Sequence, residues 1–279
     1  MKVLVTGAKG QLGFDVIKRL KAEDMECIGA DIDDFNIIDE AQTVDYISNY
    51  SPDIVIHCAA YTAVDKAEQE QDKCYNINVL GTRNVSIACK KNKCKMVYIS
   101  TDYVFDGTGE KPFEVTDKPD PINYYGYTKY LGEREVIDLI EKYYIIRISW
   151  VFGINGNNFV KTMLNLAKTK SEISVVSDQI GSPTSTYDLS ILIVEMIKQN
   201  QYGIFHATNE GFCSWYDFAC EIFKQANIKI KVNPISSEGY KTLAKRPRNS
   251  RLSKTSIEKY NKLPNWKISV SKFINKLVL

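Results

Sequence analysis

Short β-branched segments alternate with amphipathic helical segments over the first 150 residues, and this alternation strongly limits the folds available to the chain. Strands are predicted at 2–6, 26–30, 53–58, 96–100 and 143–149, and helices at 11–22, 72–91 and 125–141. Strands that alternate with helices pair in parallel through right-handed crossovers. The sequence therefore predicts an α/β fold with a doubly wound parallel sheet.

Three glycines follow the first predicted strand and open the first predicted helix, in Gly7-Ala8-Lys9-Gly10-Gln11-Leu12-Gly13. A pyrophosphate needs free backbone N–H groups, no Cβ in its way and the positive end of a helix dipole. The spacing is one residue wider than the usual dinucleotide fingerprint, but the strand before it and the helix after it match the required context. We expect a Rossmann-type dinucleotide site here.

The second predicted strand is followed by an acidic segment, Asp31-Ile32-Asp33-Asp34. A carboxylate at this place accepts hydrogen bonds from both hydroxyls of the adenosine ribose and repels a 2′-phosphate. Since the segment contains no Arg or Lys, we expect Asp31 to favour NADH, with NADPH as the alternative.

Tyr125 and Lys129 form a Tyr-x-x-x-Lys pair at the start of the helix that follows the fourth predicted strand. Their i, i+4 spacing places both side chains on one helical face. A nearby ammonium together with an oxidised nicotinamide would lower the pKa of the phenol, so we expect Tyr125 to be the acid/base and Lys129 its electrostatic partner and a ligand of the ribose. Thr101, at the end of the strand, would hydrogen-bond a substrate carbonyl.

The pattern changes after Trp150, where helices are predicted at 158–168, 187–198 and 215–226 between short strands and polar loops. We expect residues 1–150 to form the NAD(P)-binding domain. Residues 151–279 would form mainly a smaller substrate-binding part, some segments of which rejoin the sheet.

Composition excludes several classes of protein. The chain has 36 Lys and Arg against 34 Asp and Glu, which leaves no broad basic surface for nucleic acid. Its seven cysteines form no Cys-x-x-Cys pair, its two histidines cannot build a His-rich metal centre, and no apolar run reaches membrane-spanning length. The first glycine follows too soon for a signal peptide. We expect a cytoplasmic protein without a membrane partner.

Four segments together resemble the extended short-chain dehydrogenase/reductases, and within them the dTDP-4-dehydrorhamnose reductase family. These are residues 59–68 (AAYTAVDKAE), 100–109 (STDYVFDGTG), 125–129 (YGYTK) and 246–247 (RP). The resemblance covers almost the whole chain. It implies NADH-dependent reduction of the C4 ketone of dTDP-4-dehydro-L-rhamnose to dTDP-L-rhamnose, a precursor of cell-surface polysaccharide.

The resemblance also implies roles for individual residues. Coenzyme contacts would come from Gly10, Gln11, Leu12, Ala60, Tyr61 and Thr62. Thr101 and Asp102 would contact the substrate, and Trp150 would pack on the apolar face of the deoxysugar.

The chain departs from the family pattern in two places. Asn36 and Ile37 begin the turn beneath the adenine, where the family has an acidic start. Some members carry glutamates that bridge magnesium between two subunits of a homodimer, but this chain has Asp15 at one such place and Tyr187-Asp188 near the other. A homodimer is compatible with the resemblance, whereas magnesium is doubtful and no metal is expected.

Several alternative functions are compatible with the same fold. A dehydratase would carry Asp-Glu directly after the threonine, whereas this chain has Asp102-Tyr103. Another 4-ketoreductase, a 4-epimerase, or a non-catalytic subunit like the regulatory subunit of methionine adenosyltransferase stays open. It also stays open whether the basic cluster of Lys245, Arg246, Arg248 and Arg251 binds a diphosphate or is merely solvated. We expect His57 and His206 to be structural.

Overall fold

A six-stranded parallel sheet forms the centre of the computed structural model, which describes residues 1–278. The strand order is β10-β5-β4-β3-β1-β2, and every neighbouring pair is parallel. The bounds are β1 Val3–Thr6, β2 Cys27–Ala30, β3 Ile54–His57, β4 Lys95–Thr101, β5 Tyr143–Ile148 and β10 Gly203–His206. The predicted doubly wound α/β fold is confirmed.

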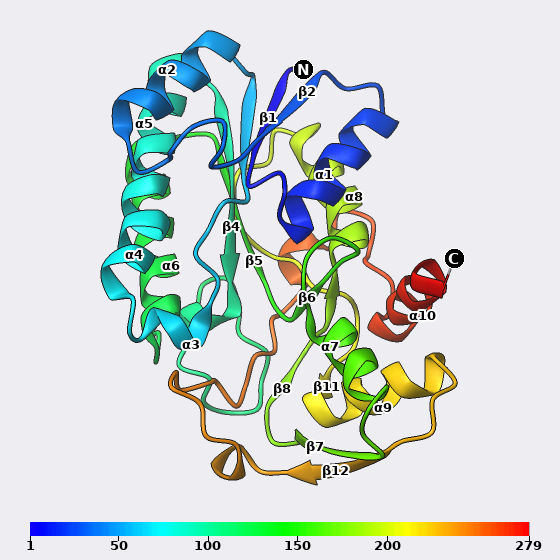
Figure 1. Ribbon diagram of the computed structural model, residues 1–279. Coiled ribbons are helices and arrows are strands. Elements are labelled where there is room, and N and C mark those ends of the chain that lie inside the picture. The colour runs from blue at the N-terminus through cyan, green and yellow to red at the C-terminus, as the bar shows by residue number, and fades with distance from the viewer. Residues whose placement is uncertain (279) are drawn as a thin grey trace.

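Helices cover both faces of this sheet (Figure 1). One face packs against α2 (Glu40–Tyr50), α5 (Gly81–Asn92) and α6 (Tyr124–Leu139), and the other against α1 (Gln11–Ala22) and α8 (Thr186–Ile197). Because side chains alternate along a strand, neighbouring residues of β1 such as Leu4 and Val5 enter different cores. The helix α2 was not predicted from the sequence.

The helix predicted over 72–91 is interrupted. It consists of α4 (Gln71–Tyr75), a π-helical turn at Asn76–Leu80 and then α5. A short helix, α3 (Val64–Ala67), precedes it. The wider turn lies where the helix passes the ligand end of the sheet, a common place for π-bulges.

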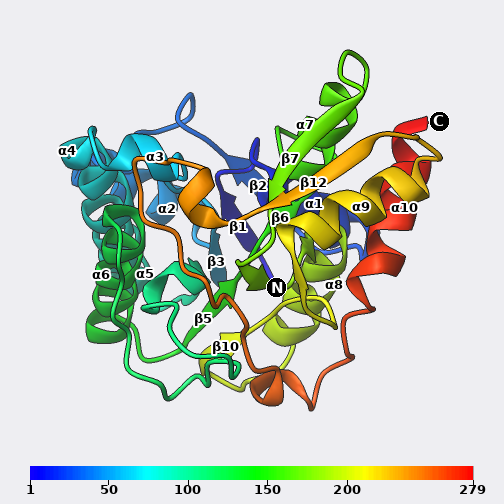
Figure 2. The same cartoon turned by 90° about the horizontal axis from the view of Figure 1, so that it is seen from below.

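Most of the chain after β5 builds a second apolar core from α7 (Phe159–Leu166), α9 (Trp215–Gln225) and α10 (Trp266–Val278). Three small sheets accompany these helices: β6 (Val151–Phe152) with β9 (Thr184–Ser185), β7 (Glu172–Val176) with β12 (Lys231–Ile235), and β8 (Ile180–Gly181) with β11 (Cys213–Ser214). In Figure 2, α9, α10 and the β7–β12 pair lie on the side of the molecule opposite to α4 and α6.

Two segments after residue 150 nevertheless belong to the main sheet layer. Strand β10 pairs with β5, and α8 packs along α1. The division of the chain at residue 150 stays a prediction. None of the helices described within residues 1–278 combines the length and the apolar character that a bilayer crossing requires.

Candidate active site

A cleft of about 1350 Å³ runs along the carboxyl ends of the central strands. Strand order reverses between β1 and β3, and a sheet of this type binds ligands at that point. The cleft is lined by the glycine turn, by the ends of β3, β4 and β5, and by residues from α6, α7 and α9. It therefore joins the sheet to the second core.

The glycine turn has the close packing expected of a phosphate-binding turn. Gly7 has a φ of +66°, and a Cβ there would lie 2.6 Å from the backbone nitrogen of Ala59. A Cβ at Gly13 would lie 2.2 Å from the carbonyl oxygen of Gly7. No side chain caps α1 at Gly10, so the first N–H groups of that helix are left for a ligand. These residues fit the pyrophosphate of a dinucleotide.

Asp31 lies at the end of the cleft that is next to β2. One carboxylate oxygen accepts a hydrogen bond from the Lys9 backbone N–H at 3.0 Å and the other from the Ile32 N–H at 2.9 Å, which fixes the group at the rim. Asn36 and Ile37 line the same end. Lys9, which the sequence analysis did not consider, pairs through its ammonium with Asp33.

Thr101, Tyr125 and Lys129 all reach the cleft. Thr101 is the last residue of β4, and Tyr125 stands in the first turn of α6, whose N-cap Asn123 accepts a hydrogen bond from the Gly126 N–H at 2.8 Å. A Cβ at Gly126 would lie 2.1 Å from the Tyr103 carbonyl oxygen, so glycine lets α6 approach the loop after β4.

In the free protein the surroundings of Tyr125 do not favour its phenolate. The pKa of Tyr125 is raised, not lowered, because the phenol is removed from bulk water and faces the Asp102 carboxylate, while the Thr101 hydroxyl only partly opposes the rise. Burial also lowers the pKa of Lys129 to about 7. In the free protein the lysine is thus a weaker partner for the phenol than expected, and Tyr125 keeps its proton at neutral pH.

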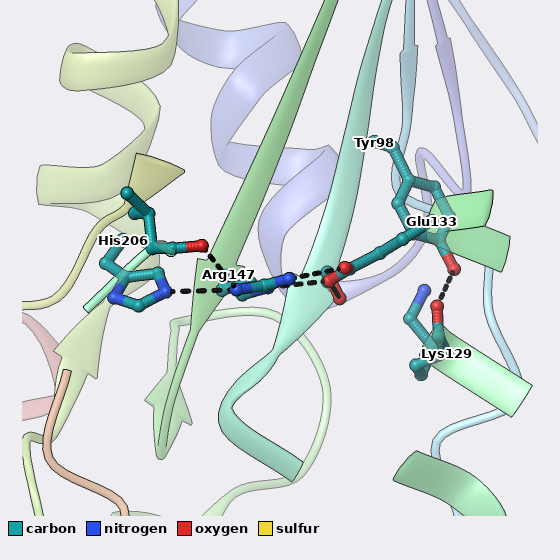
Figure 3. Close-up of polar contacts among 7 residues, drawn as sticks. Tyr98, Lys129, Glu133, Arg147 and His206 are labelled. Carbon is teal, nitrogen blue, oxygen red and sulfur yellow. Dashed lines mark hydrogen bonds and ion pairs between the residues drawn. The ribbon is translucent and has the colours of Figure 1, made fainter. Parts of the chain in front are cut away.

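A buried ion pair lies beside Lys129 (Figure 3). Arg147 of β5 donates two hydrogen bonds to Glu133 of α6, at 2.9 and 2.7 Å, and Ser100 donates a third at 2.5 Å. The carboxylate is therefore fully committed to its own partners.

The two histidines are both buried and neutral. The Nδ1 of His206 lies 3.1 Å from the Phe113 carbonyl and carries the proton, so its Nε2 accepts from Arg147 at 3.4 Å. Burial lowers the pKa of His57 and of His206 to about 3. Neither lines the cleft.

The end of the cleft next to the second apolar core is built from distant segments. Trp150 has a φ of +49°, and its ring stacks on Trp215 with centroids 3.7 Å apart. The Gly181 backbone also packs closely against this indole, where a Cβ would lie 2.7 Å from Cε2, and the rest of the ring lines the cleft. Asp102 is buried, and one of its carboxylate oxygens has no hydrogen-bond partner within residues 1–278.

Arg246 is the one member of the basic cluster that lines the cleft. Its guanidinium donates to Asp65 at 2.7 Å and to the Tyr103 hydroxyl at 3.1 Å. Arg248 instead pairs with Glu238 and Asp178 away from the cleft. Tyr103 occupies the place of the second carboxylate that dehydration would need.

The structure brings every predicted site residue to the cleft except Tyr61. The ring of Tyr61 packs with Ala67 and Cys74, and its hydroxyl donates to Glu70 at 3.1 Å. Trp215 and Phe159 line the same end of the cleft as Trp150, but the sequence analysis did not name them as site residues. An aromatic residue at the start of a predicted helix is indistinguishable, in sequence, from a residue of the hydrophobic core.

The carboxylates considered for magnesium are bound within the chain. Asp15 accepts a hydrogen bond from the Thr186 hydroxyl, and Asp188 accepts from Asn209 at 3.0 Å and from Ser269 at 2.5 Å. Among residues 1–278, no group of three or more His, Cys, Asp or Glu side chains could hold a metal ion.

Comparison with known proteins agrees with this architecture. The family model described as the RmlD substrate binding domain matches residues 1–279. The spore coat polysaccharide biosynthesis protein SpsK of Bacillus subtilis is 42% identical over 277 residues, 99% of this chain and 97% of that protein. A dTDP-4-dehydrorhamnose reductase structure from Clostridium acetobutylicum is 44% identical, with a TM-score of 0.97 and 100% of both chains covered.

A further solved structure contains a coenzyme. The dTDP-4-dehydrorhamnose reductase of Bacillus anthracis, in complex with NADP, is 43% identical with a TM-score of 0.96, covering 99% of this chain and 100% of that one. With the fold and the cleft, these relatives define the class of this chain as a nicotinamide-dependent oxidoreductase. More narrowly, it belongs to the RmlD substrate binding domain family, the family of the dTDP-4-dehydrorhamnose reductases.

Proposed function

We propose that this protein reduces the C4 ketone of dTDP-4-dehydro-L-rhamnose to dTDP-L-rhamnose with NADH. The observation that carries the proposal is the convergence of Thr101, Tyr125 and Lys129 on one cleft with the glycine turn. Relatives that are 44% and 43% identical and carry the name dTDP-4-dehydrorhamnose reductase support the choice of substrate.

Tyr125 is the proton donor in this proposal. Residues of the glycine turn would hold the pyrophosphate of the coenzyme, which when bound would supply the hydride for the ketone carbon. Tyr125 then gives its hydroxyl proton to the ketone oxygen as that oxygen gains electron density. Its raised pKa keeps the proton in place at neutral pH until the oxygen becomes basic.

Thr101 and Lys129 orient and stabilise the reacting groups. The Thr101 hydroxyl donates to Asp102 at 3.1 Å in the free protein and turns to the ketone oxygen when substrate is present. The Lys129 ammonium binds the nicotinamide ribose and stabilises the phenolate left on Tyr125.

The substrate-binding roles follow from the other end of the cleft. Trp150 packs on the deoxysugar with the part of its indole that lines the cleft, and Asp102 accepts a hydrogen bond from a sugar hydroxyl at its unpartnered oxygen. Arg246, oriented by Asp65, faces the substrate diphosphate.

The preference for NADH rests on Asp31, whose carboxylate is fixed at the rim by two backbone N–H groups. A 2′-phosphate next to it would be repelled. Lys9 lies on the same rim and offers a positive charge that could be drawn from Asp33 toward such a phosphate, so NADPH is the second coenzyme in the proposal.

Location and assembly complete the proposal. All seven cysteines are free thiols, as in most proteins of the reducing cytoplasm. The family resemblance favours a homodimer, and analytical ultracentrifugation of the purified protein tests it.

The deciding experiment follows absorbance at 340 nm with a small panel of 4-keto sugar nucleotides, using NADH and NADPH in parallel. We expect oxidation of NADH with the dTDP-4-keto-6-deoxy sugar and slower oxidation of NADPH. Coenzyme that copurifies without exchange, with interconversion of sugar epimers, would favour an epimerase. Coenzyme binding without turnover of any panel member would favour a regulatory subunit.

A further inference from the structure

The ammonium of Lys129 has an unusual environment. Its Nζ lies 4.0 Å from the centroid of the Tyr98 ring, and it takes part in no hydrogen bond or ion pair with other residues of the described chain, 1–278. The Tyr98 hydroxyl in turn donates to the Lys129 carbonyl oxygen at 3.2 Å. Figure 3 shows both residues beside the Glu133–Arg147 pair. Tyr98 of β4 thus contacts Lys129 twice, through its hydroxyl at the main-chain carbonyl and through its ring at the side-chain ammonium.

The other groups around Lys129 do not replace this contact. Glu133, one turn later on α6, is held by Arg147 and Ser100, although its charge still raises the pKa of Lys129. His57 is neutral because its pKa is lowered to about 3, and burial raises the pKa of Cys58 to about 12 and that of Cys74 above its usual range. Burial then lowers the pKa of Lys129 to about 7, so any group that stabilises its charge matters at neutral pH.

We propose that Tyr98 is a positioning residue, whose ring holds the Lys129 ammonium charged and oriented while leaving its N–H groups free for the coenzyme. A cation over an aromatic face is stabilised without using a hydrogen-bond donor. A carboxylate in the same place would instead occupy the N–H groups that the nicotinamide ribose needs. This inference rests on the proposed role of Lys129.

The packing around Tyr98 is specific for a tyrosine. The side chain is completely buried, and a Cβ at Gly132 of α6 would lie 2.2 Å from its hydroxyl oxygen. Glycine at 132 therefore makes room for the hydroxyl, which donates to the main-chain carbonyl of Lys129 and does not contact its ammonium. The ring also lies 6.0 Å from the His57 ring, whose two nitrogens are held by Thr6 and Thr82.

The test compares Tyr98→Phe, which keeps the ring, with Tyr98→Met, which keeps a similar volume without a π face. Tyr144→Met is the matched control, because Tyr144 is equally buried in the same sheet but packs in the opposite core. Two quantities are measured for each: the pKa of Lys129 in the coenzyme-free protein, by competitive amine labelling and mass spectrometry, and the pH profile of kcat/KM.

Tyr98→Met is expected to lower the pKa of Lys129, and with it the alkaline limb of the profile, by about one pH unit. Tyr98→Phe and Tyr144→Met should leave both where the wild type has them. A Tyr98→Met protein that is folded and active with an unchanged Lys129 pKa would overturn the inference. If Tyr98→Met does not fold, Tyr98→Leu is measured in its place. A wild-type protein without reductase activity would instead count against the proposed function, while the labelling result would still decide whether the ring holds the charge.

Discussion

The two ends of the cleft are built in different ways. The proposed coenzyme end uses the glycine turn, Asp31, Tyr125 and Lys129, all of which lie in the first half of the chain, at strand ends or in the first two turns of a helix. The substrate end brings together Trp150, Trp215 and Arg246 from three distant segments. Sheet topology alone positions the first set, whereas the second depends on how the C-terminal core packs against the sheet. The coenzyme end should therefore be the more rigid and the less tolerant of backbone change.

The largest expected effect separates chemistry from binding. Tyr125→Phe removes the proton donor and is expected to lower kcat by about 10²–10⁴-fold while leaving the dissociation constant of NADH unchanged. Steady-state kinetics and a fluorescence titration with NADH measure the two quantities. Tyr127→Phe, on the exposed side of the same helix, is the control. Loss of coenzyme affinity in the Tyr125 variant would show that the two functions are not separable.

The next effect tests the rigidity of the coenzyme end. Gly13→Ala places a Cβ 2.2 Å from the Gly7 carbonyl oxygen, so the turn must open. We expect NADH to bind about 100-fold more weakly, because the N–H groups of α1 lose their alignment. Gly239→Ala, where a Cβ meets nothing within 4 Å, serves as the control in the same calorimetric titration. Near-wild-type binding by Gly13→Ala would mean that the turn is compliant.

Asp102 lies where the two ends of the cleft meet. Its pKa predicts how the free energy of unfolding depends on pH. Burial raises this pKa from 3.8 to about 6, so the folded protein binds the proton more tightly than the unfolded chain does. The group therefore lowers the free energy of unfolding as pH rises from about 4 to about 6, and Asp102→Asn removes this dependence.

The difference in free energy of unfolding, Asp102→Asn minus wild type, should rise by up to about 3 kcal/mol over that range. Urea unfolding at several pH values measures it, and the exposed Asp120→Asn should give a flat difference. A flat difference for Asp102→Asn as well would show that its carboxyl titrates normally in the folded protein.

The smallest effect concerns the substrate end alone. Trp215→Leu removes the ring that backs Trp150, and Trp215→Phe keeps an aromatic one. We expect the leucine variant to raise KM for the sugar nucleotide about 10-fold, with the phenylalanine variant close to wild type. KM for NADH should not change. A parallel loss of coenzyme affinity would mean that the two ends are coupled.

The sequence predicted most of the sheet that carries the proposed coenzyme end, but not the packing of aromatic residues at the other end of the cleft, for a physical reason. Glycine spacing and strand periodicity are local patterns, so five of the six sheet strands and the glycine turn were placed correctly. The sixth strand, β10, is separated from β5 in the chain by elements of the second core. Its pairing with β5 could therefore not be predicted from a local sequence pattern. The stack of Trp150 on Trp215 joins residues 65 positions apart in the chain (215 − 150).

Other elements were missed because their patterns are weak. Helix α2 buries only Thr43 and Ile47, too few apolar positions to show a helical period. The hydrogen bond from the Gln42 N–H to Asp39 identifies Asp39 as its N-cap, and only the structure shows that bond. The raised pKa of Tyr125 was also beyond sequence reasoning, because it depends on how far the phenol lies from water and from Asp102.

The pairing of β10 with β5 has a consequence for biosynthesis. During translation the sheet keeps an open hydrogen-bonding edge at β5, and α1 lacks its neighbour α8, until about residue 206 has left the ribosome. A fragment that stops near residue 150 would expose that edge and should aggregate. Circular permutation or domain grafting of the nucleotide-binding half would therefore have to carry residues 186–206 along.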